Sequence, residues 1–344
     1  MSATVPPAPL KLADGADLSV EFLRRPVAPA DQLRVTDLLA AEWERSDVDW
    51  VPSLRGAYAD TLTSVTAIGR CGETDVGTAT VSYPVDEPEV AVVENVTTLA
   101  EHRRRGIAAE LTEAVVRLAF DAGCRLCFLG NGGRVGQRAV YDRIGFGRTG
   151  GIMRRAAPGF EAYERTLYAA GQPWSVRTAR WGDLPGVAAL VAQPLSTRVL
   201  DYQRGIASAA FVPPARCVSA FTTIHYDTQS RGGVMRVLAG AGASRVLGFG
   251  TAAPGPAPLR NATAVVDLVA HDAYGDHAGE LLAALTEDGR HLGAARAVAF
   301  VAAPDTSKRE RFLAAGYRPA GALPRDLTLG GEPADVTLLE HTYG

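Results

Sequence analysis

The chain of 344 residues carries one order of hydrophobic segments twice. In the first half, EVAVVENVTTL at 89–99 precedes an amphipathic helical pattern, which precedes CRLCFLG at 124–130. In the second half, ATAVVDLVA at 262–270, HAGELLAALTEDGRHLG at 277–293 and ARAVAFVAA at 295–303 follow in the same order. A repeat of this length exceeds a solenoid unit and predicts two domains of similar fold.

A break containing Gly and Pro, AAGQPW at 169–174, separates the two halves. We therefore expect an N-terminal domain over 1–171 and a C-terminal domain over 172–344. A short segment before the break, RTLYAA at 165–170, is expected to be a late strand of the first domain.

Alternation and helical spacing of apolar residues predict the elements of each half. The first half should contain strands at 18–26, 64–71, 75–84, 89–99, 124–130 and near 150–156. It should also contain a helix at 31–43, a second helix that begins at 107 and a short third helix that ends near 146. The second should contain strands at 175–180, 234–242, 245–254, 262–270 and 295–303, and helices at 183–193, 277–293 and around 309–319. Asp183 is the expected N-cap of its helix, and 254–258 (PGPAP) a rigid hairpin loop.

Composition limits the class of protein. Hydrophobic residues make up 47% and charged residues 21%, as expected for a globular chain. A net charge of −3 argues against broad nucleic-acid binding. No apolar run can span a bilayer, and the first ten residues lack the charged and apolar regions of a signal peptide. We expect a cytoplasmic protein without nucleic-acid or membrane partners.

Four cysteines are present, and Cys124 and Cys127 form a C-x-x-C pair. A zinc site would need a second ligand pair at suitable spacing, which the sequence lacks. A redox motif would begin a helix, whereas CRLCFLG has the pattern of a strand. We therefore expect ordinary buried cysteines.

Acids and histidines gather at 271–277, but their spacing follows no familiar metal site. Groups of this kind at turns are usually solvated. We expect no bound metal.

The stretch EHRRRGIAAEL at 101–111 places Arg103, Arg104 and Arg105 where a helix begins. A helix N-terminus already carries unpaired N–H groups and partial positive charge, so adjacent cations there repel one another and the dipole. A bound anion resolves that conflict, and Gly106 and Ala108 allow backbone to approach it closely. The stretch therefore predicts a pyrophosphate-binding turn. The alternative is a basic helix start that faces water.

The segment RRRGIA at 103–108 resembles the Q/R-x-x-G-x-G/A signature of the GNAT N-acetyltransferases. YDRIGF at 141–146 resembles their Y-x-x-x-G-F segment. The resemblance covers roughly 18–170 and, more loosely, 175–344. It implies an α/β (α+β) fold with two tandem GNAT-like domains, each a mixed, mostly antiparallel splayed sheet flanked by helices.

The same resemblance implies acetyl-CoA as co-substrate and a set of residues that contact it. The implied set is Val96, Thr97, Thr98, Arg103, Arg104, Arg105, Gly106, Ile107, Ala108 and Asn131. One departure concerns the turn GNGGR at 130–134. The family often has an asparagine seven residues before its tyrosine, whereas Arg134 stands there and Asn131 lies earlier.

Acyl transfer to an amine needs a base for the nucleophile and an acid for the leaving thiolate. Many family members have a carboxylate at the place of Glu94, and Val92, Glu94 and Val96 are expected on one strand face. The alternative for Glu94 is a polar residue on a half-exposed strand, and Asn95 is a weaker candidate for orientation. Tyr141 matches the residue that commonly protonates the CoA thiolate in the family; otherwise it is a core tyrosine.

The second half departs from the signature. Alignment of its helix on the first puts Tyr274, His277 and Gly279 at the places of the arginine and the two small residues. Phe312 stands at the place of the tyrosine and cannot donate a proton. We expect this half to serve as scaffold or to shape the acceptor cleft.

These features predict an N-acetyltransferase that transfers acetyl from acetyl-CoA to a small-molecule amine in a direct ternary complex, with its site in the N-terminal domain. Acids at 44–50 and 86–89 favour a cationic amine. Two alternatives stay open: a GNAT-fold enzyme with another acyl donor, a hydroxyl acceptor or a decarboxylation step, and a non-catalytic CoA-binding protein. The expected state is a monomer, as a pseudo-dimer of two domains, or a homodimer.

Overall fold

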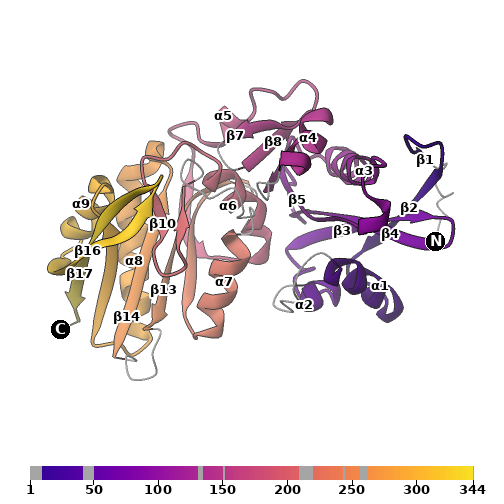
Figure 1. The fold of residues 1–344 in the computed structure, drawn as a ribbon. Helices are drawn as coiled ribbons and strands as arrows, with labels where there is room; N and C mark the ends of the chain where they lie inside the picture. The colour runs from indigo at the N-terminus through magenta and orange to yellow at the C-terminus, as the bar shows by residue number, and fades with distance from the viewer. Residues whose placement is uncertain are drawn as a thin grey trace. The chain divides into compact units, whose positions relative to one another are not determined.

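The computed structural model describes residues 10–41, 50–130, 135–149, 152–208, 220–242, 245–255 and 262–343. Contacts divide the chain into two compact units: Met1–Arg148 with Met153–Tyr163, and Thr149–Ile152 with Glu164–Gly344. Each unit contains one large sheet (Figure 1). Within the described residues, no helix has both the length and the apolar character needed to cross a membrane. The predicted boundary between 171 and 172 stays a prediction.

The sheet of the first unit has the strand order β1-β2-β3-β4-β5-β6-β8-β7. Its strands are β1 (Leu10–Lys11), β2 (Asp17–Arg24), β3 (Leu62–Cys71), β4 (Thr74–Pro84), β5 (Val90–Thr98), β6 (Leu126–Gly130), β7 (Gly147–Thr149) and β8 (Ile152–Ala156). Its helices are α1 (Pro29–Ala40), α2 (Trp50–Leu54), η1 (Ala100–His102), α3 (Ile107–Asp121) and α4 (Val135–Arg143). Strands β2 to β5 pair antiparallel, and β5 pairs with β6 in parallel.

Helices cover both faces of this sheet, with α3 on one face and α1 and α2 on the other (Figure 1). In α3, Ile107, Leu111 and Val115 recur at helical spacing and are fully buried against the sheet. On the opposite face, Leu38 and Leu39 of α1 pack in a separate core cluster. The two clusters fix the sheet between the helices.

Strands β5 and β6 separate partway along their length. Their parallel pairing runs from Val90 opposite Leu126 to Val93 opposite Leu129, and β5 then continues to Thr98. The second half of β5 is therefore not part of the ladder with β6. This separation produces the splayed sheet that the sequence predicts.

The sheet of the second unit has the order β16-β17-β15-β14-β13-β12-β9, beside a two-stranded sheet of β10 and β11. Its strands are β9 (Trp174–Thr178), β10 (Val199–Asp201), β11 (Ile206–Ala207), β12 (Val234–Gly240), β13 (Val246–Pro254), β14 (Thr263–Ala270), β15 (Arg296–Ala302), β16 (Arg318–Leu329) and β17 (Glu332–Thr342). Its helices are α5 (Glu164–Leu167), η2 (Trp181–Asp183), α6 (Leu184–Val191), α7 (Ala220–Ser230), η4 (Asp272–His277), α8 (Ala278–His291) and α9 (Thr306–Ala314).

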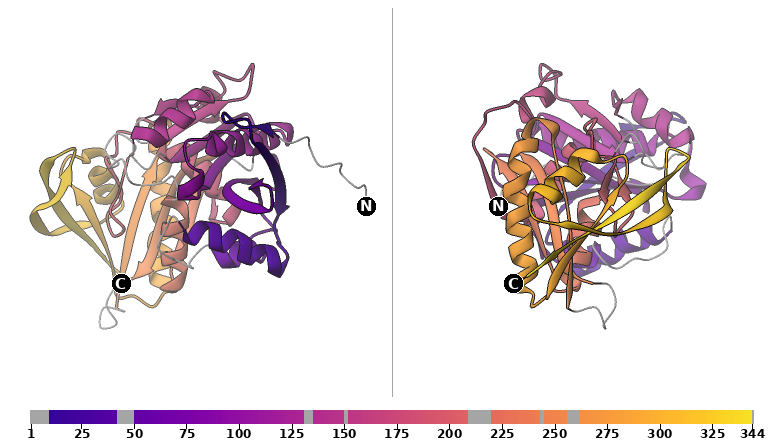
Figure 2. Two further views of the ribbon diagram at one scale, coloured as in Figure 1. Left: turned by 45° about the vertical axis from the view of Figure 1, so that its right-hand side comes forward. Right: turned by 90° about the vertical axis from the view of Figure 1, so that its left-hand side faces the viewer.

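The second unit repeats the arrangement of the first. Helix α8 covers one face of the sheet, and α6 and α7 cover the other (Figure 1). Parallel pairing of β14 with β15 runs from Thr263 opposite Arg296 to Val265 opposite Val298, after which the strands separate. The long β16–β17 hairpin twists away from the other strands of this sheet (Figure 2). The expected mixed, mostly antiparallel sheets flanked by helices are thus confirmed in both units.

The expected strand at 165–170 is wrong, because this segment contains the single helical turn α5. Leu167 and Tyr168 are both buried, so the side chains do not alternate as on a half-buried strand. The Gln172 side chain donates to the Leu167 carbonyl oxygen at 2.7 Å and stabilises the end of the turn.

Two further expectations concern the ends of elements. Asp183 precedes α6, but its side chain does not cap that helix. Its carboxylate accepts hydrogen bonds from the Arg180 N–H at 2.8 Å and from the Arg177 guanidinium. The expected hairpin loop at 254–258 lies largely outside the described residues.

Candidate acyl-transfer site of the first unit

The arginine turn has an unusual backbone conformation. Arg104 has a φ of 64° and Gly106 a φ of 93°, so two left-handed residues precede α3. Such turns direct successive N–H groups toward one place, where an anion can bind. A Cβ built on Gly106 would meet no atom within 4 Å. The glycine is therefore required by its φ, and it also leaves open space beside the turn.

A cavity of about 410 Å³ lies at this turn. It is lined by Val96, Thr97, Thr98, His102, Arg103, Arg104, Gly106, Ile107, Ala108, Ala109, Val140, Tyr141 and Arg143. The cavity thus brings together the end of β5, the start of α3 and the end of α4. Of the predicted CoA-contacting residues, eight line the cavity. Arg105 does not, and Asn131 lies outside the described residues, as does Arg134.

Arg105 turns to other partners. Its Nε donates to Asp14 Oδ2 at 2.6 Å, and its Nη1 lies 2.9 Å from His102 Nδ1. The hydrogen bond from Arg105 lowers the pKa of the Asp14 carboxyl. Arg105 therefore ties the turn to the segment between β1 and β2, while the Arg103 and Arg104 side chains lie at the cavity.

Thr98 connects the turn to β5. The Arg103 Nε donates to the Thr98 carbonyl oxygen at 3.1 Å. The Thr98 Oγ1 is buried and lacks a hydrogen-bond partner among the described residues. A buried hydroxyl without a partner is costly, so a polar group of a ligand in the cavity would satisfy it. The orphaned hydroxyl, the open space at Gly106 and the two arginines together fit a phosphate-bearing ligand.

Strand β5 contains a bulge beside the cavity. Thr80 lies opposite Glu94 and Thr78 opposite Thr97, so two residues of β5 stand against one of β4. Asn95, in the bulge, has a φ of 54°. The expectation that Val96 shares a face with Glu94 is therefore wrong, because the extra residue reverses the alternation. Val96 instead packs with the core cluster on the α3 face.

Glu94 is the last residue of β5 before the bulge. Its side chain is half-buried and lies on the face that carries α1 and α2, together with the hydroxyls of β4. The Ser82 Oγ donates to Glu94 Oε1 at 3.1 Å. Ser82 and, directly across the ladder, Thr80 therefore neighbour Glu94 on a face where valines were expected.

Tyr141 lies in the last part of α4 and lines the cavity. Its ring packs edge-on against Phe146, with 6.3 Å between ring centroids. The Phe146 N–H donates to the Tyr141 carbonyl oxygen at 3.0 Å and closes the turn after the helix. The Y-x-x-x-G-F segment therefore folds back on itself and holds the tyrosine at the cavity.

The second unit has a carboxylate at the strand position of Glu94, which the sequence comparison did not single out. Asp267 lies opposite Thr251 of β13, as Glu94 lies opposite Thr80 of β4, and each carboxylate follows an Ala-Val-Val run. Asp267 is 4% exposed and forms an ion pair with Lys308 of α9. Burial raises the pKa of Asp267, and the Lys308 ammonium opposes that rise.

The segment 198–202 lies where β14 and β15 separate. The Tyr202 N–H donates to Asp267 Oδ2 at 2.9 Å, and its ring stacks on Phe300 of β15 at 4.7 Å. Lys308 Nζ donates to the Val199 carbonyl oxygen at 3.0 Å. The Val199 N–H donates to Asp305 Oδ2 at 2.9 Å. Both strands and α9 therefore hold this segment in place.

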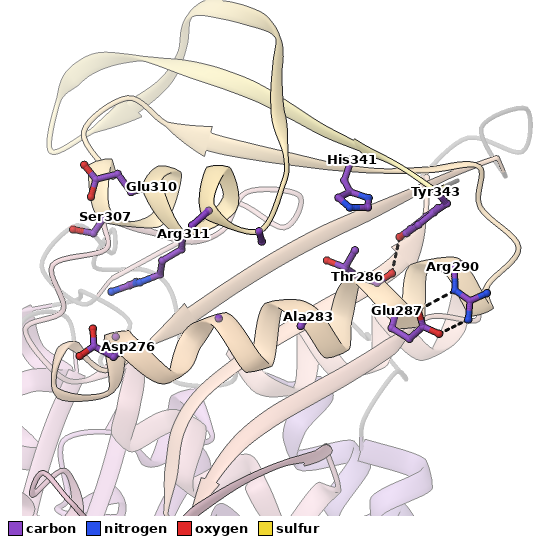
Figure 3. Close-up of a pocket in the computed structure, with 14 residues that line it drawn as sticks. Asp276, Ala283, Thr286, Glu287, Arg290, Ser307, Glu310, Arg311, His341 and Tyr343 are labelled. Atoms are coloured by element: carbon purple, nitrogen blue, oxygen red, sulfur yellow. Dashed lines mark hydrogen bonds and ion pairs between the residues drawn. The ribbon is translucent and has the colours of Figure 1, made fainter.

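A groove of about 940 Å³ lies along α8 in the second unit (Figure 3). Figure 3 shows α9 and the end of β17 above it, with Asp276 and Glu310 toward one end and Glu287 bonded to Arg290 at the other. Asp276 stands near the start of α8, where the first unit has arginine. Arg311 of α9 lies beside Gly275 at the same end, so an acid and an arginine stand together where the first unit has adjacent arginines.

Cys124 and Cys127 are free and buried in or beside β6. Burial raises the pKa of the Cys124 thiol to about 12 and raises that of Cys127 as well. Both are therefore inert thiols, as expected. In the part of the chain that the structure describes, no group of three or more His, Cys, Asp or Glu residues could hold a metal ion.

Residues 35–146 match the family model described as the acetyltransferase (GNAT) family. The match includes the arginine turn, β5 and Tyr141. The chain therefore contains a GNAT acetyltransferase domain within its first unit. A search of curated proteins finds no match to the chain.

Solved structures of similar fold each cover about half of the chain. A ribosomal-protein-alanine N-acetyltransferase from Brucella melitensis is 16% identical, with 49% of this chain and 99% of that chain covered and a TM-score of 0.40. A phosphinothricin acetyltransferase from Sinorhizobium meliloti, in complex with acetyl-CoA, is 15% identical, with 50% and 89% covered and a TM-score of 0.41. A putative acetyltransferase from Salmonella typhimurium with acetyl-CoA is 16% identical, with 49% and 93% covered and a TM-score of 0.40.

Proposed function

We propose that the first unit is an N-acetyltransferase that transfers acetyl from acetyl-CoA to a small-molecule amine in a direct ternary complex. One observation carries this proposal: a single cavity joins the arginine turn, the bulged end of β5 and Tyr141. Each of these parts corresponds to one task of acyl transfer, namely holding phosphate, holding the acyl arm and supplying a proton.

The turn before α3 holds the pyrophosphate. Arg103 and Arg104 supply charge and forked donors, and the N–H groups at the start of α3 add their partial positive charge. The open space at Gly106 lets the phosphate approach the backbone. Arg105 does not contact the phosphate directly and instead supports the turn through its hydrogen bond to Asp14.

The end of β5 holds the acyl arm. Beyond Val93 the strand is no longer paired with β6, so Val96, Thr97 and Thr98 present a strand edge at the cavity. Backbone N–H and C=O groups there bind the amides of an extended arm as a neighbouring strand would. The bulge at Asn95 redirects this edge toward the cavity.

Two side chains move protons. Acetyl-CoA supplies the activated acetyl group as a thioester. Glu94 takes a proton from the acceptor amine, directly or through water, so that nitrogen attacks as a neutral nucleophile. The Tyr141 hydroxyl donates its proton to the departing sulfur. Because Glu94 lies on the α1 and α2 face and the cavity on the α3 face, we place the acceptor on the α1 side of β5.

The location of the enzyme is also a proposal. Cys71, Cys124 and Cys127 are free, as is usual in a reducing compartment. We therefore place the reaction in the cytoplasm, with one working site per chain.

A panel of amines, amino acids and aminoglycosides tested with acetyl-CoA, with released thiol as the readout, tests this function. The proposal expects thiol release that depends on one class of amine, and a product heavier by one acetyl group in mass spectrometry. Parallel reactions with longer acyl-CoAs and with alcohols separate the alternative enzymes. CoA binding without thiol release from any acceptor would support a non-catalytic CoA-binding protein instead.

A further inference from the structure

Buried hydroxyl side chains line the α1 and α2 face of the first unit's sheet. Ser64 of β3 and Ser82 of β4 lie opposite each other with 2.8 Å between their Oγ atoms. Two residues along, Thr66 and Thr80 form a matching pair at 2.9 Å. All four are at most 3% exposed. Buried hydroxyls are stable only when hydrogen-bonded, so each pair satisfies itself across the two strands.

The serine pair extends to a charged group. Ser82 Oγ lies 3.1 Å from Glu94 Oε1. An ionised carboxylate only accepts hydrogen bonds, so Ser82 is the donor. Its single proton is then used, and the 2.8 Å contact requires Ser64 to donate to Ser82. The two hydrogen bonds therefore form a chain with one donor direction, from Ser64 through Ser82 to Glu94.

The serine hydrogen bonds lie beside the part of β5 where its regular strand pairing ends. Ser82 lies opposite Val92, two residues before Glu94, and the bulge at Asn95 follows directly. Pairing of β5 with β6 has ended at Val93. The regular ladder on the β6 side thus ends just where the carboxylate must hold a fixed orientation, and the serine bond comes from β4, which is still in register.

We propose that Ser82, supported by Ser64, is a positioning residue for Glu94, which holds the carboxylate of the acyl-transfer base ionised and in one orientation. This inference rests on the proposed function of the first unit. Ser82 touches neither acetyl-CoA nor the acceptor in this account and acts through Glu94 alone.

The hydroxyl chain also accommodates the protonated base. When Glu94 takes a proton from the amine, its new O–H can donate to Ser82 Oγ, and Ser82 can then donate to Ser64. The number of protons in the chain rises by the one that Glu94 accepted, and the hydrogen bonds reverse direction. Because the donated bonds favour the anion, the chain sets the pH at which Glu94 becomes a base.

The test compares Ser82→Ala with wild type in the pH profile of kcat/KM for the acceptor. Loss of a hydrogen bond to a charged group should move the acidic limb about one to two pH units higher. Activity should therefore fall about ten- to hundredfold below that limb and approach wild type above it. KM for acetyl-CoA should change little. A variant that only weakened the fold would lower activity at all pH values alike.

Other titratable groups on the elements packed against β5 stay unchanged in the variant. Those that line the neighbouring cavity are His102, Arg103, Arg104, Tyr141 and Arg143, and those on α1 are Asp31, Arg34 and Asp37. His102→Gln is the control for the one histidine among them. The acidic limb should therefore persist in His102→Gln and be absent in Glu94→Gln.

Thr66→Val is the matched control. It removes a buried hydroxyl from the same face and leaves Thr80 without this partner, while both members of the Ser82–Glu94 hydrogen bond at 3.1 Å stay in place. The limb should stay in place. An equal shift in Thr66→Val would overturn the specific role of the serines. If Ser82→Ala fails to fold, Ser82→Cys keeps the side-chain size with a weaker donor and should give a smaller shift of the same sign.

Glu94→Gln separates the two proposals. If it leaves acetyl transfer unchanged, the proposed base is wrong and the serine role falls with it. If it lowers transfer but Ser82→Ala and Ser82→Cys leave the limb in place, the proposed function stands and the serine role is wrong. A shift in Ser82→Ala and none in Thr66→Val supports the inference.

Discussion

Each unit has a pair of parallel strands that separate partway along their length, but the residues beyond the separation differ between the units. In the first unit, β5 and β6 pair as far as Val93 and Leu129. In the second, β14 and β15 pair as far as Val265 and Val298. Beyond this point β5 is bulged and borders a cavity, whereas β14 keeps regular register with β13 through Ala270.

The turn that follows each strand differs as well. The first unit has left-handed Arg104 and Gly106 before its helix, and the second has His277 with a φ of −88°. The second unit places Tyr202 across the separated strands, hydrogen-bonded to Asp267 and stacked on Phe300. A splayed sheet alone therefore does not produce the cavity that we propose as the acyl-transfer site. A bulge, a left-handed turn and an accessible strand edge distinguish the two units.

A carboxylate at the same strand position shows the difference most clearly. Glu94 is half-buried and accepts from Ser82. Asp267 is buried and paired with Lys308. In our account the first serves chemistry and the second serves folding, and each of the following variants tests one side of that contrast.

The largest effect is expected for Tyr141→Phe, which keeps the ring and its contact with Phe146 but removes the hydroxyl. Loss of a general acid should lower kcat about a hundred- to ten-thousandfold, with little change in CoA affinity. Steady-state kinetics with the best acceptor measures this. Unchanged kcat, under conditions where chemistry limits the rate, would remove Tyr141 from the mechanism.

A pair of isosteric amides tests the two carboxylates. Asp267→Asn breaks the buried pair with Lys308 and should cost about 3–5 kcal/mol of unfolding free energy, because the ammonium is left buried without its partner. Glu94→Gln should change stability little but lower acetyl transfer strongly. Denaturant unfolding and thiol release, measured on both variants, check the contrast. Similar stability losses in the two variants would contradict it.

The arginines of the turn should differ from one another. Arg103→Ala should weaken acetyl-CoA binding by about 1.5–3 kcal/mol, visible as a higher KM, because it removes a charged hydrogen bond to phosphate. Arg105→Ala should have a smaller effect on KM, since Arg105 is bonded to Asp14 and does not line the cavity. Equal effects would mean that Arg105 also contacts the ligand.

The smallest effects concern two glycines at the corresponding helix starts. Gly106→Ala forces a Cβ into a left-handed residue and should cost about 1–2 kcal/mol of unfolding free energy and some CoA affinity. Gly279→Ala in α8 meets no atom within 4 Å and has no such φ. It should stabilise the protein by up to about 1 kcal/mol and leave CoA affinity unchanged. Thermal unfolding and acetyl-CoA KM distinguish the two, and a loss of CoA affinity in Gly279→Ala would argue for a ligand in the second unit.

Much of the fold could be predicted because it follows from periodicity. The helical spacing of Ile107, Leu111 and Val115 and the repeated strand runs specify which faces are buried, and the order of elements was confirmed in both units. The segment at 165–170 was misassigned because six residues carry too little periodicity to separate a helical turn from a strand. The helix α7, the β10–β11 pair and the β16–β17 hairpin were not predicted, because the repeated pattern did not include them.

The site was harder to predict wherever one residue changed the geometry. Counting alternate residues placed Val96 beside Glu94, but a single extra residue in the strand reversed the face. Three adjacent arginines have the same side-chain chemistry, and only the fold shows that Arg105 faces Asp14. Asp267 matches Glu94 in sequence, yet its partner Lys308 lies 41 positions away, so the sequence alone does not show that it is paired.

The central claim is that one unit binds CoA through the arginine turn and the other does not. Isothermal titration of CoA into wild type and Arg103→Ala tests it most directly. Our account predicts one CoA per chain for wild type and an affinity for Arg103→Ala that is about tenfold weaker or more. Two equivalent CoA sites per chain, or equal affinities of the two proteins, would contradict the account.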